Sequence, residues 1–140
     1  MFKNILVPFD FSAGGEAALK LAVRMAQQNQ GTLTLLHIGV SPAIAWADLT
    51  HDGIVLPQSL LELHQQIAKE QRERLEKAGK ELIPEGVHWN AVLREGFPPD
   101  EILLQVEAGA HDLLVMGTHG RTGLEHVLVG SVAERVLRRA

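Results

Sequence analysis

The sequence predicts an α/β fold, in which one domain holds a parallel sheet with helices on both faces. Short apolar runs alternate with longer segments of helical periodicity along the chain, an order typical of strands joined by right-handed crossover helices. The length of 140 residues and the hydrophobic content of 46% match one domain with a sizeable core. We therefore expect residues 1–140 to form a single doubly wound unit.

The first strand and the first helix are expected near the amino terminus. Asn4–Val7 is a short apolar run that stops at Pro8, as a strand buried on both faces would. A helix follows over Ala13–Asn29, because its apolar residues recur three and four positions apart. Ser12 is expected to cap this helix and Gly31 to end it.

The same alternation continues through the middle of the chain. We expect a strand at Thr32–Ile38, a long helix at Leu60–Ile83 and a third strand at Val87–Leu93. The outer face of the long helix carries glutamates four residues before lysines or arginines, which marks it as solvated. The segment Gly39–Pro57 between them has no clear period and is longer than a routine connection.

Three further elements complete the expected fold. Pro98 and Pro99 open a helix that Gly109 closes, Asp112–Met116 forms a fourth strand, and a last helix runs over Ser131–Arg139. The expected sheet has four strands in the order 3-2-1-4.

Composition and charge argue against several classes of protein. A net charge of -4 gives no basic footprint, so we expect no nucleic acid and no anionic membrane as partner. Cysteine is absent, which suits a reducing cytoplasm. The longest apolar runs fall short of the roughly 18 residues that a membrane span needs. The expectation is a cytoplasmic protein.

The most informative stretch joins the fourth strand to the last helix. Gly117, Gly120 and Gly130 stand at fixed offsets, and Ser131 adds a hydroxyl group. Glycines let backbone N–H groups approach an anion without a Cβ in the way. In the order 3-2-1-4, this stretch leaves the fourth strand beside the exit of the first strand at Asp10, where open α/β sheets bind ligands. The spacing is neither a P-loop nor a G-x-G-x-x-G fingerprint.

The G-x2-G-x9-G-[ST] spacing, together with Asp10 after the first strand, resembles the ATP-binding pattern of the universal stress protein family. Further matching segments are K-N-I-L-V-P-F-D at Lys3–Asp10, L-L-H-I at Leu35–Ile38, D-L-L-V-M-G-T-H-G at Asp112–Gly120 and G-S-V-A-E-R-V at Gly130–Val136. The resemblance covers nearly the whole chain and implies a Rossmann-like fold of the adenine nucleotide alpha hydrolase type. It also implies an ATP site at Pro8, Asp10, Ile38, Met116, Gly117, His119, Gly120, Gly130, Ser131 and Val132.

Physical roles follow for the central members of this set. Gly117 and Gly120 would let the chain turn over ribose and phosphate, while the Gly130–Val132 amides and the Ser131 hydroxyl group would face the phosphates. Asp10 would repel bare phosphate, so it belongs on the adenosine or on a Mg²⁺ ion that bridges the phosphates. Arg121 is a cation that could close over the phosphates.

Structural roles compete with these assignments. The glycines could serve turns only, while Asp10 and Ser131 could each cap a helix. Of the histidines, His119 is as suited to ligand contact as to the surface, whereas His37 at a strand end is expected to pack. The seven histidines, His37, His51, His64, His88, His111, His119 and His126, show no metal-ligand spacing such as H-E-x-x-H.

Three functions remain open from the sequence. The first is an ATP-binding regulator of the stress response with at most slow hydrolysis, because no catalytic constellation is visible. The second is an adenylyl or phosphoryl transferase on the same scaffold, which would need a base and a fixed cationic clamp. The third is an interaction module without a ligand.

The resemblance also implies a homodimer, since relatives pair through the edge of a fifth strand that usually follows the last helix. In this sequence Ala140 ends the chain before such a strand, so the fifth strand is expected to be missing. If that end is native, the dimer contact is in question.

Overall fold

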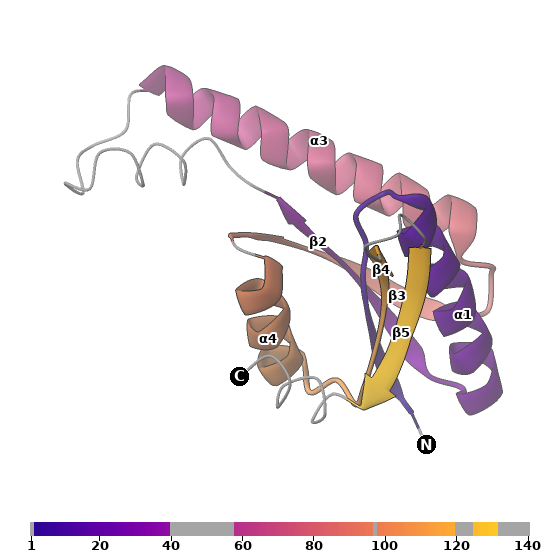
Figure 1. Cartoon of the computed structure of the whole chain (residues 1–140). Helices are drawn as coiled ribbons and strands as arrows, with labels where there is room; N and C mark the ends of the chain where they lie inside the picture. Colours follow the sequence, from indigo (N-terminus) through magenta and orange to yellow (C-terminus); the bar gives the residue numbers. More distant parts are fainter. Residues whose placement is uncertain (1, 40–57, 97, 120–124, 132–140) are drawn as a thin grey trace.

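The computed structural model describes residues 2–39, 58–96, 98–119 and 125–131 (Figure 1). The helices and strands, in chain order, are β1 (Asn4–Pro8), α1 (Ala13–Asn29), β2 (Thr32–Gly39), α3 (Gln58–Leu82), β3 (His88–Glu95), α4 (Pro98–Gly109), β4 (Leu113–His119) and β5 (Glu125–Ser131).

The sheet has the order β3-β2-β1-β4-β5, and its first four strands are parallel. This confirms the predicted order 3-2-1-4. The expectation of only four strands was wrong, because β5 pairs with β4 in the antiparallel direction along the full length of both strands. The free N–H and C=O groups along the edge of β4 favour such a pairing.

The fifth strand also corrects the start of the last helix. Ser131 is the final residue of β5 and pairs with Leu113, so it does not begin a helix. The remainder of that predicted helix, residues 132–139, lies outside the described residues.

Helices cover both faces of the sheet, as predicted. Helices α1 and α3 lie on one face and α4 lies on the other (Figure 1). The larger apolar cluster joins α1 and α3 to the sheet through residues such as Leu19, Leu75 and Leu35, all fully buried. The smaller cluster lies under α4, where Val106 packs with Leu6, Leu36 and Leu114.

The ends of α1 show one prediction confirmed and one corrected. Ser12 caps the helix, since its hydroxyl oxygen accepts a hydrogen bond from the Gly15 N–H. The helix ends at Gln30, which adopts the left-handed conformation that Gly31 was expected to supply. Gly31 is required for another reason: a Cβ there would lie 2.9 Å from the carbonyl oxygen of Phe2.

Candidate functional site

Strands β1 and β4 separate toward their carboxyl ends. Their pairing extends over only two positions, Ile5 with Leu113 and Leu6 with Leu114. By contrast, β1 pairs with β2 over five positions, and the Phe9 N–H continues that contact by donating to the Leu36 carbonyl oxygen at 2.7 Å. The Asp112 carboxylate holds the opposite ends of β1 and β4 together by accepting the backbone N–H groups of residues 3 and 4. An opening therefore forms where the strand order reverses, the place at which open α/β sheets bind ligands.

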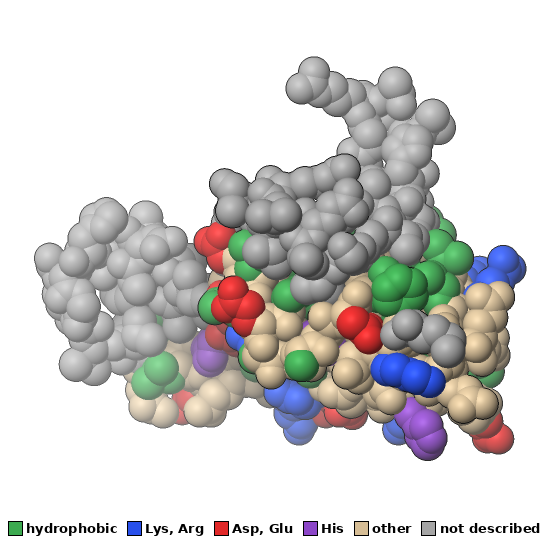
Figure 2. Space-filling model, turned by 90° about the horizontal axis from the view of Figure 1, so that it is seen from below, with side chains coloured by type: hydrophobic (Ala, Val, Ile, Leu, Met, Phe, Trp, Pro, Cys, Tyr) green, Lys and Arg blue, Asp and Glu red, His purple; other side chains and the backbone are tan. Residues whose placement is uncertain are grey.

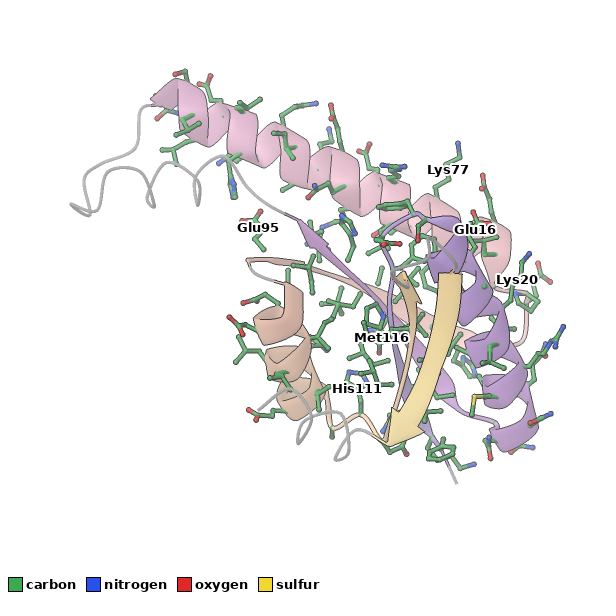
Figure 3. All side chains as sticks on the ribbon, in the orientation of Figure 1. Glu16, Lys20, Lys77, Glu95, His111 and Met116 are labelled. Atoms are coloured by element: carbon green, nitrogen blue, oxygen red, sulfur yellow. The ribbon has the colours of Figure 1, made fainter. Side chains whose placement is uncertain are left out.

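A cavity of about 200 Å³ lies at this opening. Four of its lining residues, Leu36, Ile38, Ile102 and Met116, belong to the apolar cluster between the sheet and α4. Figure 3 shows Met116 in the middle of the sheet on this side. The described residues that line it are Pro8, Phe9, Asp10, Gly15, Leu36, His37, Ile38, Ile102, Met116 and Gly117.

Among the described lining residues the one carboxylate is that of Asp10, in the turn between β1 and α1. Its Oδ1 accepts hydrogen bonds from both the backbone N–H and the hydroxyl group of Ser12. The Ser12 oxygen in turn accepts the Gly15 N–H at 3.0 Å. The carboxylate is thus tied to the first turn of α1, and Ser12, rather than Asp10, is the helix cap.

Two glycines allow close contacts at the start of α1, Gly117 with the backbone of the helix and Gly15 with the Asp10 carboxylate. A Cβ on Gly117 would lie 2.6 Å from both the carbonyl carbon and the carbonyl oxygen of Gly14. A Cβ on Gly15 would lie 2.9 Å from Oδ1 of Asp10. Gly117 therefore has a packing role as well as a place in the cavity wall, and it lies within β4 rather than in the turn weighed for it from the sequence.

His37 packs at the end of β2, as predicted, and also lines the cavity. Its ring lies 4.8 Å from the Phe11 ring, and its Nδ1 lies 2.8 Å from the Phe9 carbonyl oxygen. A carbonyl oxygen only accepts, so Nδ1 carries the proton and donates. The hydrogen bond fixes the chain just before Asp10.

The structure brings together part of the predicted site. The five predicted residues that line the cavity are Pro8, Asp10, Ile38, Met116 and Gly117. His119 is the last residue of β4 and pairs with Glu125. Gly120 and Val132 lie outside the described residues.

Gly130 and Ser131 lie elsewhere on the sheet. They pair with Leu114 and Leu113, whereas Gly117 pairs with Val127. The three-residue offset between Leu114 and Gly117 corresponds to about 10 Å along the strand. In the described fold, these two predicted phosphate-binding residues are therefore at the opposite end of β4 from the cavity.

The remaining lining residues were not in the predicted set, and they are Phe9, Gly15, Leu36, His37 and Ile102. Phe9, Leu36 and His37 adjoin predicted residues in the sequence, so strand-end position could have indicated them. Gly15 and Ile102 come from helices, and the sequence does not reveal how far these helices lie from the ends of the strands.

The chemistry of the described lining suits an uncharged aromatic group better than a bare anion. Its wall is largely apolar, and among the described residues it contains no lysine or arginine. The described part of the chain also shows no cluster of three or more residues able to hold a metal ion, and none of its helices has the length and apolarity needed to cross a membrane. On the face shown in Figure 2, basic, acidic and hydrophobic side chains intermingle.

Comparison with known proteins agrees with this architecture. The model of the universal stress protein family matches residues 1–140. This chain belongs to the universal stress protein family. The universal stress protein YxiE of Bacillus subtilis is 33% identical over 138 residues, an alignment that covers 97% of this chain and 92% of that relative.

Solved structures of universal stress proteins show the same fold. The structure of MJ0577 from Methanocaldococcus jannaschii has a TM-score of 0.71 at 30% identity, covering 100% of this chain and 91% of that one. The structure of UspA from Lactobacillus plantarum has a TM-score of 0.64 at 26% identity, covering 99% and 92%.

Proposed function

We propose that this universal stress protein binds ATP in the cavity between the ends of β1 and β4, and acts as a cytoplasmic, nucleotide-responsive regulator of the stress response. The observation that carries the proposal is the cavity itself, an apolar hollow with one carboxylate at the point where the strand order reverses. A nucleoside offers the matching chemistry, a flat base for the apolar wall and hydroxyl groups for a carboxylate.

Within this proposal the base lies against the apolar wall of Ile38, Ile102 and Met116. Asp10 serves the adenosine or a Mg²⁺ ion, since Mg²⁺ is commonly held by one or two carboxylates together with phosphate oxygens. Because the described lining contains no lysine or arginine, the phosphates depend on the stretch from His119 to Val132, which includes Gly120, Gly130 and Ser131. Moving Gly130 and Ser131 to the cavity would require β5 to leave its present pairing with β4.

Two more distant solved structures of this fold contain adenine nucleotides. One is an Arabidopsis thaliana universal stress protein family protein with AMP bound, at 19% identity and a TM-score of 0.56. The other is a universal stress protein in complex with cAMP, at 21% identity and a TM-score of 0.52. At these identities the likeness shows the fold, so the proposal for this chain rests on its own cavity.

The proposed regulation acts through a homodimer whose pairing changes with nucleotide occupancy, with ATP hydrolysis slow at most. Sedimentation velocity with and without Mg-ATP tests this part. A dimer whose population shifts with nucleotide supports it, and a monomer under both conditions contradicts it.

Isothermal titration calorimetry with Mg-ATP tests the binding site. We expect saturable binding to the wild-type protein and binding about tenfold weaker or worse in Met116→Trp, because the larger indole ring would fill space in the cavity that the base needs; a loss of about 1.4 kcal/mol in binding free energy is a factor of ten. Leu104→Trp is the matched control, since Leu104 lies on α4 with 49% of its surface exposed and does not line the cavity. No heat with the wild-type protein, or equal binding by both variants, contradicts the proposal.

A further inference from the structure

Phe11 adopts an unusual backbone conformation next to the proposed site. Its φ is +66°, in the left-handed region that side chains with a Cβ disfavour. It lies between Asp10, whose carboxylate lines the cavity, and Ser12, which caps α1. Such a conformation persists where the surroundings determine it, and such positions cluster at functional sites.

Three side chains hold the Phe11 ring in place. The Arg74 guanidinium of α3 lies 3.9 Å from the ring centroid, a cation–π contact. The Phe9 ring meets it edge-on at 5.1 Å, and the His37 ring lies against it at 4.8 Å. The left-handed turn is therefore fixed by contacts from the residue that follows β1, from β2 and from α3.

The residues on both sides of Asp10 are thus anchored to other elements. Phe9 is held on one side by the hydrogen bond from His37 to its carbonyl oxygen, and Phe11 is held on the other by Arg74. These two anchors and the hydrogen bonds from Ser12 restrict the direction in which the Asp10 carboxylate points.

Space exists for the ring to move if Arg74 is lost. A second hollow of about 260 Å³ lies between α1 and α3 and is lined by Phe11 and Arg74, with Glu16 and Lys77 at its rim. Figure 3 shows Glu16 and Lys77 where the two helices approach each other. Arg74 lines this hollow and does not line the nucleotide cavity.

We propose that Phe11 and Arg74 are positioning residues for the nucleotide cavity, which hold the left-handed turn that aims the Asp10 carboxylate. This inference rests on the proposed function, because it assigns the cavity to a nucleotide. It predicts that a change on the outer helix α3 alters binding without any contact between Arg74 and the ligand.

The first test needs no nucleotide. In NMR spectra of the free protein, Arg74→Ala is expected to shift the amide signals of Ser12 and Gly15, whose N–H groups donate to Asp10 and to Ser12. Arg72→Ala is the control, because Arg72 is an exposed residue of the same helix. Equal spectra for the two variants in this turn overturn the inference, whatever the protein binds.

The second test is a double-mutant cycle on Mg-ATP affinity. Arg74→Ala is expected to weaken binding about three- to fivefold, the size of one cation–π contact. If Arg74 acts through Asp10, the combined variant Arg74→Ala/Asp10→Asn loses no more affinity than Asp10→Asn alone. Phe11→Tyr keeps the ring and is expected to bind like the wild-type protein, whereas Phe11→Gly permits the left-handed turn but loses affinity.

The outcomes separate the two proposals. If Asp10→Asn weakens binding and Arg74→Ala does not, the positioning role is wrong and the nucleotide site stands. Additive losses in the cycle likewise overturn the positioning role. If the wild-type protein binds no ATP, the proposed function fails, and the amide shifts still decide whether Arg74 sets the turn.

Discussion

Gly117 shows how one residue can meet a packing demand and a binding demand together. It lines the cavity as a member of the predicted site, although it lies within β4 and not in a turn, while its contact with Gly14 means that the strand and helix could not approach as they do with any side chain present. A glycine in a site pattern is therefore not evidence of ligand contact by itself.

The packing demand at Gly117 can be measured directly. Gly117→Ala is expected to lower the free energy of unfolding by about 1–3 kcal/mol, the range for inserting a methyl group where no space exists. Urea denaturation without nucleotide provides the measurement. Met116→Leu, a volume-conserving change at the adjacent residue, should cost less than about 1.5 kcal/mol. If both variants lose the same small amount of unfolding free energy, the close contact between Gly117 and the Gly14 backbone does not restrict the side chain at position 117.

For single residues, the sequence predicts the structural role correctly where the partner is close in the chain. The cap at Ser12 depends only on Gly15, three residues later, and it is confirmed. The left-handed residue that follows α1 is Gln30 and not the predicted Gly31, because the demand on that glycine comes from Phe2, far away in sequence. The left-handed turn at Phe11 has no sequence signal, since its stabilising contacts come from residues 37 and 74.

Helix α4 is joined to β3 and to the start of β4 by a chain of polar side chains. The Glu101 carboxylate lies 3.6 Å from the Arg94 guanidinium, and the Arg94 Nε donates to Oε1 of Gln105 at 2.9 Å. This bond turns the Gln105 amide nitrogen toward Nε2 of His111, 3.2 Å away. Nε2 must then accept, so the neutral ring carries its proton on Nδ1, a buried atom with no hydrogen-bond partner among the described residues.

This arrangement predicts a pH dependence of stability. Burial lowers the pKa of His111 from 6.5, and the nearby Asp112 carboxylate opposes that effect only in part. The unfolded chain therefore binds a proton at this residue more readily than the native protein does. As the pH falls below about 6.5, the free energy of unfolding therefore decreases. The decrease stops once the pH is below the pKa of His111 in the native protein, where both states bind the proton.

The matching experiment compares the free energy of unfolding of the wild-type protein and His111→Gln between pH 8 and pH 5. The difference between them is expected to shrink as the pH falls, since only the wild-type protein carries the titrating group. His88→Gln, which replaces an exposed histidine of β3, is the control variant. A constant difference for His111→Gln would contradict the assignment. Figure 3 shows His111 near the end of α4.

The sequence predicts elements whose hydrophobic residues recur at a regular spacing, such as helix α1. It does not predict strand β5, which is defined by its pairing with β4. The predicted helix at Ala13–Asn29 has the observed bounds, because its apolar stripe is local information. The sequence does not predict a strand at Glu125–Ser131, since the strand character of this segment depends on the free edge of β4 beside it. An edge strand cannot be told from a loop until its neighbour is known.

For the whole molecule, topology places the cavity more reliably than motif spacing does. The order β3-β2-β1-β4 alone locates the opening at the ends of β1 and β4, and the lining residues from these strands and from Ile38 follow from it. The glycine spacing also indicated Gly130 and Ser131, but spacing along the chain carries no information about register, and the register of β5 puts them at the other end of β4.

A ligand that binds only the folded molecule must also stabilise it as a whole. If Mg-ATP occupies the cavity, an ATP concentration 100 times the dissociation constant adds about 2.7 kcal/mol to the free energy of unfolding. For a domain of this size, that corresponds to a rise in Tm of about 5–10 °C. Thermal unfolding followed by circular dichroism over a series of ATP concentrations should show a shift that grows with the logarithm of the concentration. Met116→Trp should lose the shift and Leu104→Trp should keep it. A Tm independent of ATP in the wild-type protein would favour an interaction module without a ligand, because a nucleotide that binds only the folded protein must raise its Tm.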